Sequence, residues 1–302
     1  MNDSMIAGAG LAGLIAAQVF QRSHIYEIAT APLQQHRALL RFRTDAVAKL
    51  TGIEFTPVTV RKGIWVQTEF VPPSIRLANM YSHKILRRYE PDRSIWNLDP
   101  VQRFIAPENL YEQLVDLAGT RIHWGTPIDF KGSNAPAIIS TIPLPALLAQ
   151  VDPYCWNLKF QRSPIVVARF RIEDCNLYQT IYFPDQNTGA YRASITKDLL
   201  IIESIDKQAD ETEVLRAFGI HPSFATEVDS GFQEYGKIVP LLREQSQAIL
   251  HRLTTTHNIY SLGRFATWRN ILLDDVVQDA AVIFRLMRSS NYGKALHFSK
   301  SP

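Results

Sequence analysis

The sequence has little cysteine and lacks the short motifs of metal-dependent and nucleophile-dependent enzymes. Its 302 residues include only two cysteines, Cys155 and Cys175, too few for a disulfide framework or a cysteine-based zinc site. The eight histidines show no metal-ligand spacing, and no HExxH segment, GxSxG turn or Walker loop occurs. We therefore predict a reduced intracellular setting, no metal, and chemistry that comes from a bound organic cofactor.

Long apolar runs are also missing. The longest candidate, Met5 to Phe20, is interrupted by three patterned glycines and has no basic residue before it, which argues against a secretory signal. No uninterrupted apolar stretch reaches the roughly 18 residues that a membrane span needs. We expect a cytoplasmic protein without a membrane partner.

The composition, 46% hydrophobic and 20% charged, is that of a folded protein with one large domain or two intertwined ones. The net charge of +3 is unevenly spread. Residues 36–103 hold 12 Lys or Arg and 6 Asp or Glu, whereas the rest of the chain holds 20 and 23. A basic, aromatic-rich segment of this kind favours an anionic partner, although an unevenly charged surface is the alternative.

A glycine motif, GAGLAG, follows a short apolar strand predicted at Met5–Ala7 and opens a helix predicted over 11–21. Gly8 permits the tight turn, Gly10 removes a side chain that would block a pyrophosphate, and Gly13 lets the helix pack closely on the strand. The helix start offers N–H groups and a partial positive charge to phosphates. The motif predicts a dinucleotide site.

The acid that completes this motif is Glu27, at the end of a second strand predicted over His24–Glu27. It follows Gly8 by 19 positions, near the expected interval of about 20. A carboxylate here binds ribose hydroxyls and disfavours the 2′-phosphate of NADP.

The rest of the chain predicts two intertwined domains. Strand and helix patterns recur near both ends, at 110–118, 121–124, 137–141, 258–262 and 276–288, with Asp274 or Asp275 as N-cap of the last helix. Between them, strands at 165–172, 180–183, 191–195 and 199–205 indicate an antiparallel sheet, followed by helices at 210–218 and 239–251. We predict an α/β fold: a Rossmann-like domain completed by the C-terminus (1–30, 104–150, 253–302) and a second α+β domain with an antiparallel sheet (31–103, 151–252).

Three blocks together resemble the superfamily of flavin-dependent amine oxidases and UDP-galactopyranose mutase. They are GAGLAG with Glu27, STIPLPALL at 140–148, and LGRFATWRNILLDDVVQDA at 262–280, three separated blocks in the same order as in the family. The resemblance implies an FAD-dependent oxidoreductase, or a redox-neutral mutase or lyase, that acts through flavin N5 on an amine-bearing or hydroxylated, anionic substrate.

The resemblance also implies roles for individual residues. The cofactor-binding set is Gly8, Gly10, Leu11, Ala12, Gly13, Glu27, Arg43, Ile128, Thr141, Gly263, Arg264, Asp275 and Val276. In relatives, the helix behind the aspartates aims backbone N–H groups at the flavin. For Arg264 the alternative is an ion pair with Asp274 or Asp275. The Gly-Gly-Arg segment of relatives is missing after Glu27, and Arg37, Arg41 or Arg43 could replace it electrostatically.

On the substrate side we expect Lys237 and Tyr235 near the flavin ring, with a solvated surface position as the alternative for the lysine. Arginines combined with aromatic residues bind phosphates and stack on bases. The expected substrate-binding residues are Arg41, Arg87, Arg88 and Trp268.

Two alternatives stay open. HRALLRFRT and RSIWNLDPVQRFIAPENLY also resemble phage flavoproteins of thymine hypermodification, which implies an amino-acid-modified base in DNA as substrate, a flipped base, and the host cytoplasm. Alternatively, the fold serves a non-catalytic binder, as in Rab-escort-like proteins. The oligomeric state does not follow from the sequence.

Overall fold

The computed structural model describes residues 4–32, 40–89, 94–130, 137–152, 158–205 and 210–298, with the backbone alone for 290–298. His36, Arg37, Arg93 and Cys155 lie outside the described residues. The chain divides into two compact units. Unit 1 comprises Met1–Phe55, Ala106–Phe160 and Pro240–Pro302, and unit 2 comprises Thr56–Ile105 and Gln161–Val239.

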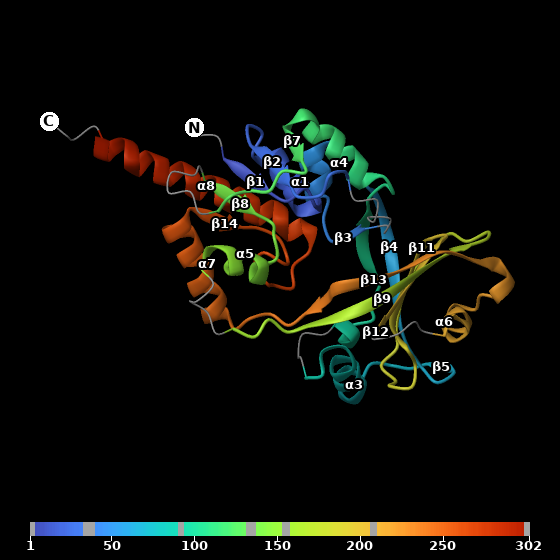
Figure 1. Ribbon diagram of the computed structural model, residues 1–302. Coiled ribbons are helices and arrows are strands. Elements are labelled where there is room, and N and C mark those ends of the chain that lie inside the picture. Colours follow the sequence, from blue (N-terminus) through green and yellow to red (C-terminus); the bar gives the residue numbers. More distant parts are fainter. Residues whose placement is uncertain are drawn as a thin grey trace. The chain divides into compact units, whose positions relative to one another are not determined.

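Unit 1 is built on a five-stranded parallel sheet with the order β14-β8-β1-β2-β7 (Figure 1). Its strands are β1 (Met5–Ala7), β2 (His24–Glu27), β7 (Ile122–Trp124), β8 (Ile138–Ser140) and β14 (Ile259–Ser261). Every pairing is parallel. The prediction of a Rossmann-like sheet completed by the far end of the chain is confirmed.

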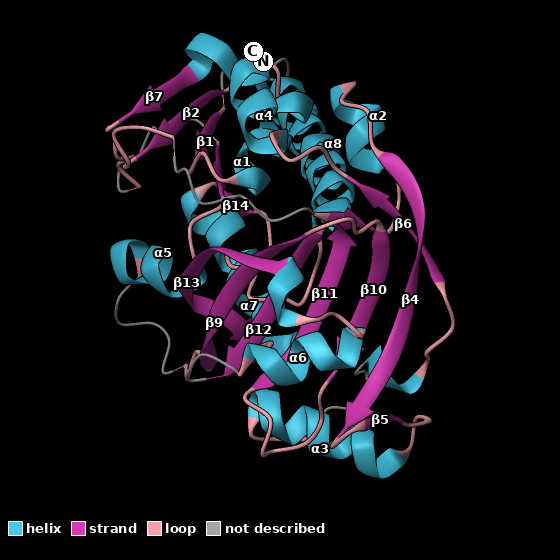
Figure 2. Ribbon diagram, turned by 90° about the vertical axis from the view of Figure 1, so that its right-hand side faces the viewer, coloured by secondary structure: helices cyan, strands magenta, loops and turns pink. Residues whose placement is uncertain are grey.

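The helices of unit 1 pack mainly around α1 (Leu11–Val19), most of which is buried. It contacts α2 (Ala46–Thr51), α4 (Leu110–Ala118) and α8 (Leu273–Phe298), and Figure 2 shows these four together. The remaining elements are α5 (Leu144–Val151), α7 (Arg243–His257), the two-residue strand β3 (Arg41–Phe42) and the 3-10 turn η2 (Gly119–Arg121).

The unit boundaries differ from those expected from the sequence. The segment 41–55 belongs to unit 1 because α2 packs on α1 and α8. Helix α7 belongs there because it packs on β14, which follows it in the chain. Both segments are joined to the rest of unit 1 by packing contacts that the sequence patterns did not report.

Unit 2 contains a mixed sheet with the order β13-β9-β12-β11-β10-β4-β6. All its pairs are antiparallel except β10 with β4. The strands are β4 (Thr56–Val66), β6 (Val101–Ile105), β9 (Arg162–Ile172), β10 (Leu177–Tyr182), β11 (Ala190–Lys197), β12 (Leu199–Ile205) and β13 (Ala225–Ile238), and β5 (Glu69–Phe70) pairs with β4. The predicted antiparallel sheet is confirmed. The basic segment, residues 36–103, supplies β4, β6 and the helix α3 (Ile75–Leu86) to this unit.

Two helices cover opposite faces of this sheet. Alternation along β4 sends Ile64 into a cluster with α3 and Trp65 into a cluster with α6 (Glu211–Phe218). Short 3-10 turns, η1 (Ser94–Trp96) and η3 (Pro222–Phe224), complete the unit. No helix among the described residues is long and apolar enough to cross a bilayer.

Lys84 of α3 is a buried residue of unit 2. Its Nζ, which carries three N–H, lies within hydrogen-bonding distance of four backbone carbonyls from the end of β10 to the start of β11, those of Phe183, Asp185, Thr188 and Ala190, at 2.9, 2.5, 2.7 and 2.7 Å. Burial lowers the pKa of Lys84 to about 8, against the opposing effect of two nearby carboxylates. This member of the basic segment therefore holds a loop rather than facing an anion.

Candidate functional site

The three motif glycines have different structural roles. Gly8 has φ +101°, and a Cβ there would lie 2.6 Å from Thr141 Oγ1. A Cβ on Gly13 would lie 1.9 Å from the carbonyl oxygen of Gly8. Gly10 has ordinary dihedrals (φ −71°, ψ 174°), and a Cβ there would meet nothing within 4 Å. The first and third glycines are required by the protein itself, whereas the second leaves open space at the start of α1.

The carboxylate of Glu27 is fixed beside this turn. Its Oε2 accepts from the Ala9 N–H at 2.7 Å and its Oε1 from the Ala29 N–H at 3.0 Å. The Thr126 N–H donates to the Glu27 carbonyl at 2.9 Å, so the chain after β7 runs beside the same strand end. Ile128, expected near the cofactor, lies four residues beyond the end of β7 at Trp124, outside any assigned helix or strand.

Three blocks that are distant in sequence meet at the carboxyl ends of β1, β8 and β14. The N–H and hydroxyl of Thr141 both donate to the Ala7 carbonyl, at 3.0 and 2.8 Å. The Leu262 N–H donates to the Ser140 carbonyl at 2.8 Å, and a Cβ on Gly263, which has φ +95°, would lie 3.0 Å from the Cβ of Ala12. In open α/β sheets this edge is where ligands bind.

Tyr111 of α4 also belongs to this edge, and the sequence did not reveal it. It is buried, and its hydroxyl donates to the Ala9 carbonyl at 3.2 Å, between the first two motif glycines. A tyrosine on an amphipathic helix carries no motif, so only the packing of α4 on α1 brings it here.

The start of α8 binds the segment after β3. Asp274 is buried and accepts three hydrogen bonds, from the Arg43 N–H (3.1 Å), the Thr44 N–H (3.0 Å) and the Thr44 hydroxyl (2.8 Å). Asp275 accepts from Arg43 Nη2 at 2.5 Å and from the Leu272 N–H at 2.8 Å. Arg43, expected near the cofactor, is ion-paired with Asp275.

Several expectations for this region need correction. Because α8 begins at Leu273, Asp274 and Asp275 lie in its first turn and neither is the N-cap. The N–H groups of Asp275 and Val276 both donate to the Leu272 carbonyl, so they are used within the helix. The guanidinium of Arg264 lies 5.4 Å from the ring centroid of Phe265.

Trp268 was expected to contact substrate, but it has no exposed surface. Its ring meets that of Phe160 edge-on at 5.0 Å. A side chain enclosed in this way packs as part of the core, and its position does not support a substrate contact.

The other predicted substrate residues are divided between the units. Arg41 lies in unit 1, on β3. Arg87 and Arg88 lie in unit 2, exposed at the end of α3, where Arg87 has φ +56° and the Arg88 carbonyl accepts from the Ser82 hydroxyl.

The two candidate catalytic residues of β13 have different surroundings. Tyr235 lies under the guanidinium of Arg162, 4.5 Å from the ring centroid. Lys237 Nζ lies 4.8 Å from the ring centroid of Tyr191 and 3.9 Å from Glu203 Oε1, with 14% of its side chain exposed. Lys237 is thus a largely covered cation beside a carboxylate.

Glu203 of β12 is paired with Lys237 and with Arg192, and no sequence motif marked it. Oε1 accepts from the Tyr191 hydroxyl at 2.8 Å, and Oε2 accepts from Arg192 Nε. Burial opposes the charge of Glu203, but Arg192 and Lys237 outweigh it and lower its pKa to about 2. Burial and the Glu203 charge raise the pKa of Tyr191, so the phenol stays protonated. The cluster carries a net charge of +1.

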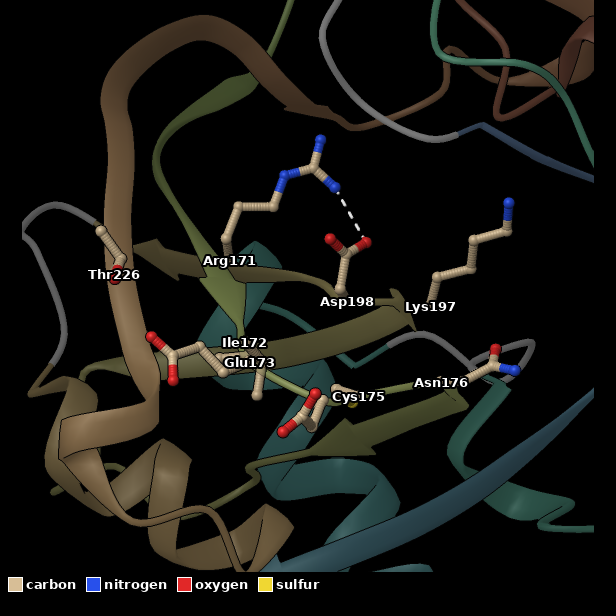
Figure 3. Close-up of a pocket in the computed structure, with 9 residues that line it drawn as sticks. Arg171, Ile172, Glu173, Cys175, Asn176, Lys197, Asp198 and Thr226 are labelled. Atoms are coloured by element: carbon tan, nitrogen blue, oxygen red, sulfur yellow. Dashed lines mark hydrogen bonds and ion pairs between the residues drawn. The ribbon is translucent and has the colours of Figure 1, made fainter.

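Unit 2 also has an open cavity of about 610 Å³ at the turns between β9 and β10 and between β11 and β12. Arg171 Nη1 and Asp198 Oδ1, which both line it, form an ion pair at 2.9 Å. Figure 3 shows this pair, with Lys197 next to Asp198. None of the cofactor-binding, substrate-binding or catalytic residues predicted from the sequence lines this cavity. No group of three His, Cys, Asp or Glu side chains suited to a metal occurs in the described part of the chain.

Comparison with known proteins shows the fold but no family. No family model matches the sequence, and no curated protein matches it significantly. Among solved structures, the chain is similar to a reduced UDP-galactopyranose mutase at TM-score 0.70 and 15% identity, covering 95% of this chain and 94% of that one. It is similar to a CLA-producing fatty acid isomerase from P. acnes at TM-score 0.59 and 12% identity, covering 93% of this chain and 98% of that one. It is also similar to a putative FAD-containing monooxygenase from Photorhabdus luminescens at TM-score 0.55 and 12% identity, covering 96% of this chain and 89% of that one.

Proposed function

We propose that this protein is an FAD-dependent enzyme, an oxidoreductase or a redox-neutral mutase, that acts on a small anionic substrate. The open space at Gly10, between two glycines that the fold itself requires, carries the proposal. A fold shared with a putative FAD-containing monooxygenase and with a UDP-galactopyranose mutase supports it.

The residues present fit the adenosine diphosphate part of FAD. A pyrophosphate would pass over Gly10, where no side chain intrudes, at the positive end of α1. Glu27 would hold the ribose, because each of its oxygens accepts one N–H and has capacity for a further donor. Thr141, Gly263 and Arg264 follow the adjoining strand ends and would line the remainder of the cofactor. When bound, FAD supplies hydride or electron transfer at N5.

Lys237 remains our candidate for the residue that faces the substrate. Glu203 keeps a negative charge beside it, so Lys237 would act as a fixed cation that orients an anionic group rather than as a base. The ring of Tyr191 limits the positions open to Nζ.

The visible spectrum of the purified protein tests the proposal. We expect a flavin spectrum, directly or after reconstitution with FAD. A colourless protein that cannot be reconstituted would refute the proposal and favour a partner-binding role on the same fold.

A flavoenzyme that acts on a modified base in DNA is the second candidate. The observation that favours it is the end of α3, where Arg87 and Arg88 are exposed beside Tyr89 (69% exposed), with Trp96 (46%) in the following segment of the same unit. Exposed arginines with aromatic rings suit a nucleic-acid strand. We would measure binding to duplex and single-stranded DNA over a salt series. A steep loss of affinity with salt supports DNA, and absent binding excludes it.

A further inference from the structure

Two irregularities in the sheet of unit 2 converge on one carboxylate. The β11–β12 ladder shifts register at 190–192, and the β9–β13 ladder shifts at 233–237. Consecutive strand residues ordinarily point to opposite faces, but a bulge redirects the side chains next to it. Tyr191 and Arg192 are consecutive, yet both bind Glu203.

Arg192 is held in an unusual way compared with the other ion-paired arginines of this unit. Among the described residues, the ion pairs of Arg162, Arg169 and Arg171 use a terminal nitrogen, Nη1 or Nη2, to reach the carboxylate. Arg192 instead uses Nε, the nitrogen nearest the chain. Glu203 therefore holds the guanidinium of Arg192 at Nε, and Nη1 and Nη2 form the end of the group that is farther from the backbone.

The outer end of Arg192 is available for a ligand. Its side chain is 36% exposed, whereas that of Glu203 is 13% exposed. Within the described part of the chain, Nη1 and Nη2 have no hydrogen-bond partner. Two parallel N–H donors in a fixed plane match the two oxygens of a carboxylate or phosphate.

We propose that Arg192 binds an oxyanion, a carboxylate or phosphate group of the substrate, through Nη1 and Nη2, with Glu203 as the positioning residue. The assignment of this anion to the substrate rests on the proposed function. Glu203 fixes the plane of the guanidinium and cannot itself take the anion, since its oxygens are occupied and negative. Lys237 leaves the cluster with a net positive charge, which favours an incoming anion.

Anion binding to the full-length, FAD-loaded protein tests this assignment. Titration calorimetry at constant ionic strength would use inorganic pyrophosphate as the phosphate probe and succinate as the carboxylate probe. We expect one of them to bind, and Arg192→Gln to weaken it about tenfold or more, because two charge-assisted hydrogen bonds are lost. Arg192→Lys should recover only part of the affinity, since an ammonium lacks the planar fork.

The role of Glu203 is tested by conservative rescue. Glu203→Gln should weaken anion binding and Glu203→Asp should restore part of it, although both alter packing at the same position. Arg171→Gln is the matched control: Arg171 lies in the same sheet, is 38% exposed and also pairs with one carboxylate. Its substitution should leave the affinity unchanged.

Several results would overturn the assignment: no binding of either probe, wild-type affinity in Arg192→Gln, or loss of affinity in Arg171→Gln. If Arg192→Gln fails to fold because Glu203 loses its main cation, the double variant Arg192→Gln/Glu203→Gln removes both charges and carries the same expectation. The flavin spectrum separates the two proposals. FAD binding without anion binding refutes the Arg192 site alone, whereas Arg192-dependent anion binding in a protein that takes no FAD refutes the proposed function alone.

Discussion

Matched alanine substitutions at Gly10 and Gly13 should separate cofactor binding from folding. At Gly10 the dihedrals suit an ordinary residue and a Cβ meets nothing within 4 Å. Gly10→Ala should therefore change the free energy of unfolding by less than about 1 kcal/mol, because the freedom lost by the unfolded chain offsets the weaker preference of alanine for the N-cap position. At Gly13 the added Cβ would lie 1.9 Å from the carbonyl oxygen of Gly8. Cβ atoms in real structures essentially never come within 3.0 Å of such an atom.

Gly13→Ala therefore forces β1 and α1 apart by about 1 Å and should cost about 1–3 kcal/mol or more, as overpacking does. Among variants that fold, Gly10→Ala should lose more affinity for FAD than Gly13→Ala, the reverse of their order in loss of stability. A methyl group over the turn at Gly10 displaces the pyrophosphate from the helix N–H groups, and losing about 2 kcal/mol of charge-assisted bonding weakens binding about thirtyfold. Gly10→Val enlarges the same obstruction.

Urea unfolding measures the stabilities, and quenching of flavin fluorescence measures the affinity for FAD. The reasoning fails if Gly10→Val binds FAD like the wild type, since the cofactor then does not cross this position. It also fails if Gly13→Ala is as stable as the wild type, since the close packing of β1 and α1 would then be absent.

Three further predictions concern side chains that stabilise unit 1 or unit 2 from within. Lys84→Met should destabilise unit 2 by about 4 kcal/mol in urea unfolding, about 1 kcal/mol for each carbonyl that loses its donor, whereas Lys62→Met, which removes one exposed bond, should cost less than about 1 kcal/mol. The pKa of Glu203 is lowered to about 2 from an ordinary 4.5, so its ionised form stabilises the folded state by about 3 kcal/mol. This contribution is present above pH 4.5 and is lost as the pH falls toward 2. The stability difference between wild type and Glu203→Gln should therefore shrink over that range, and a difference independent of pH would contradict the ion cluster. Asp274→Ala removes the acceptor of three hydrogen bonds and should lower the free energy of unfolding, measured by thermal denaturation, by about 2–4 kcal/mol. The same substitution at the more exposed Asp275 should lower it by about 1 kcal/mol or less.

The start of unit 1 was largely predictable because its signals are local. Strand, glycine turn, helix and acid follow one another within residues 5–27, and each has a steric or electrostatic requirement that shows in the residue type. The expected strands β1 and β2 match the structure residue by residue. The start of α8 was misplaced because either aspartate is a plausible cap, and only the partners at Arg43 and Thr44 reveal their positions.

The basic segment was harder to interpret because its charges have unrelated uses. Lys84 is buried under four carbonyls, while Arg87 and Arg88, three and four positions later, are exposed. Residue type cannot distinguish a cation that ties a loop from one that meets solvent, since the acceptors for Lys84 come from about 100 positions away.

The sequence by itself determined the glycine turn, the placement of Glu27 and the completion of the sheet by the C-terminal strand, because these depend on backbone sterics and short-range periodicity. Only the tertiary structure decided which glycine is open to a ligand, which cations are already paired, and that Tyr191, Arg192 and Lys237 gather at Glu203. The physical reason is that burial, register shifts and the desolvation of charges are set by contacts between segments far apart in the chain.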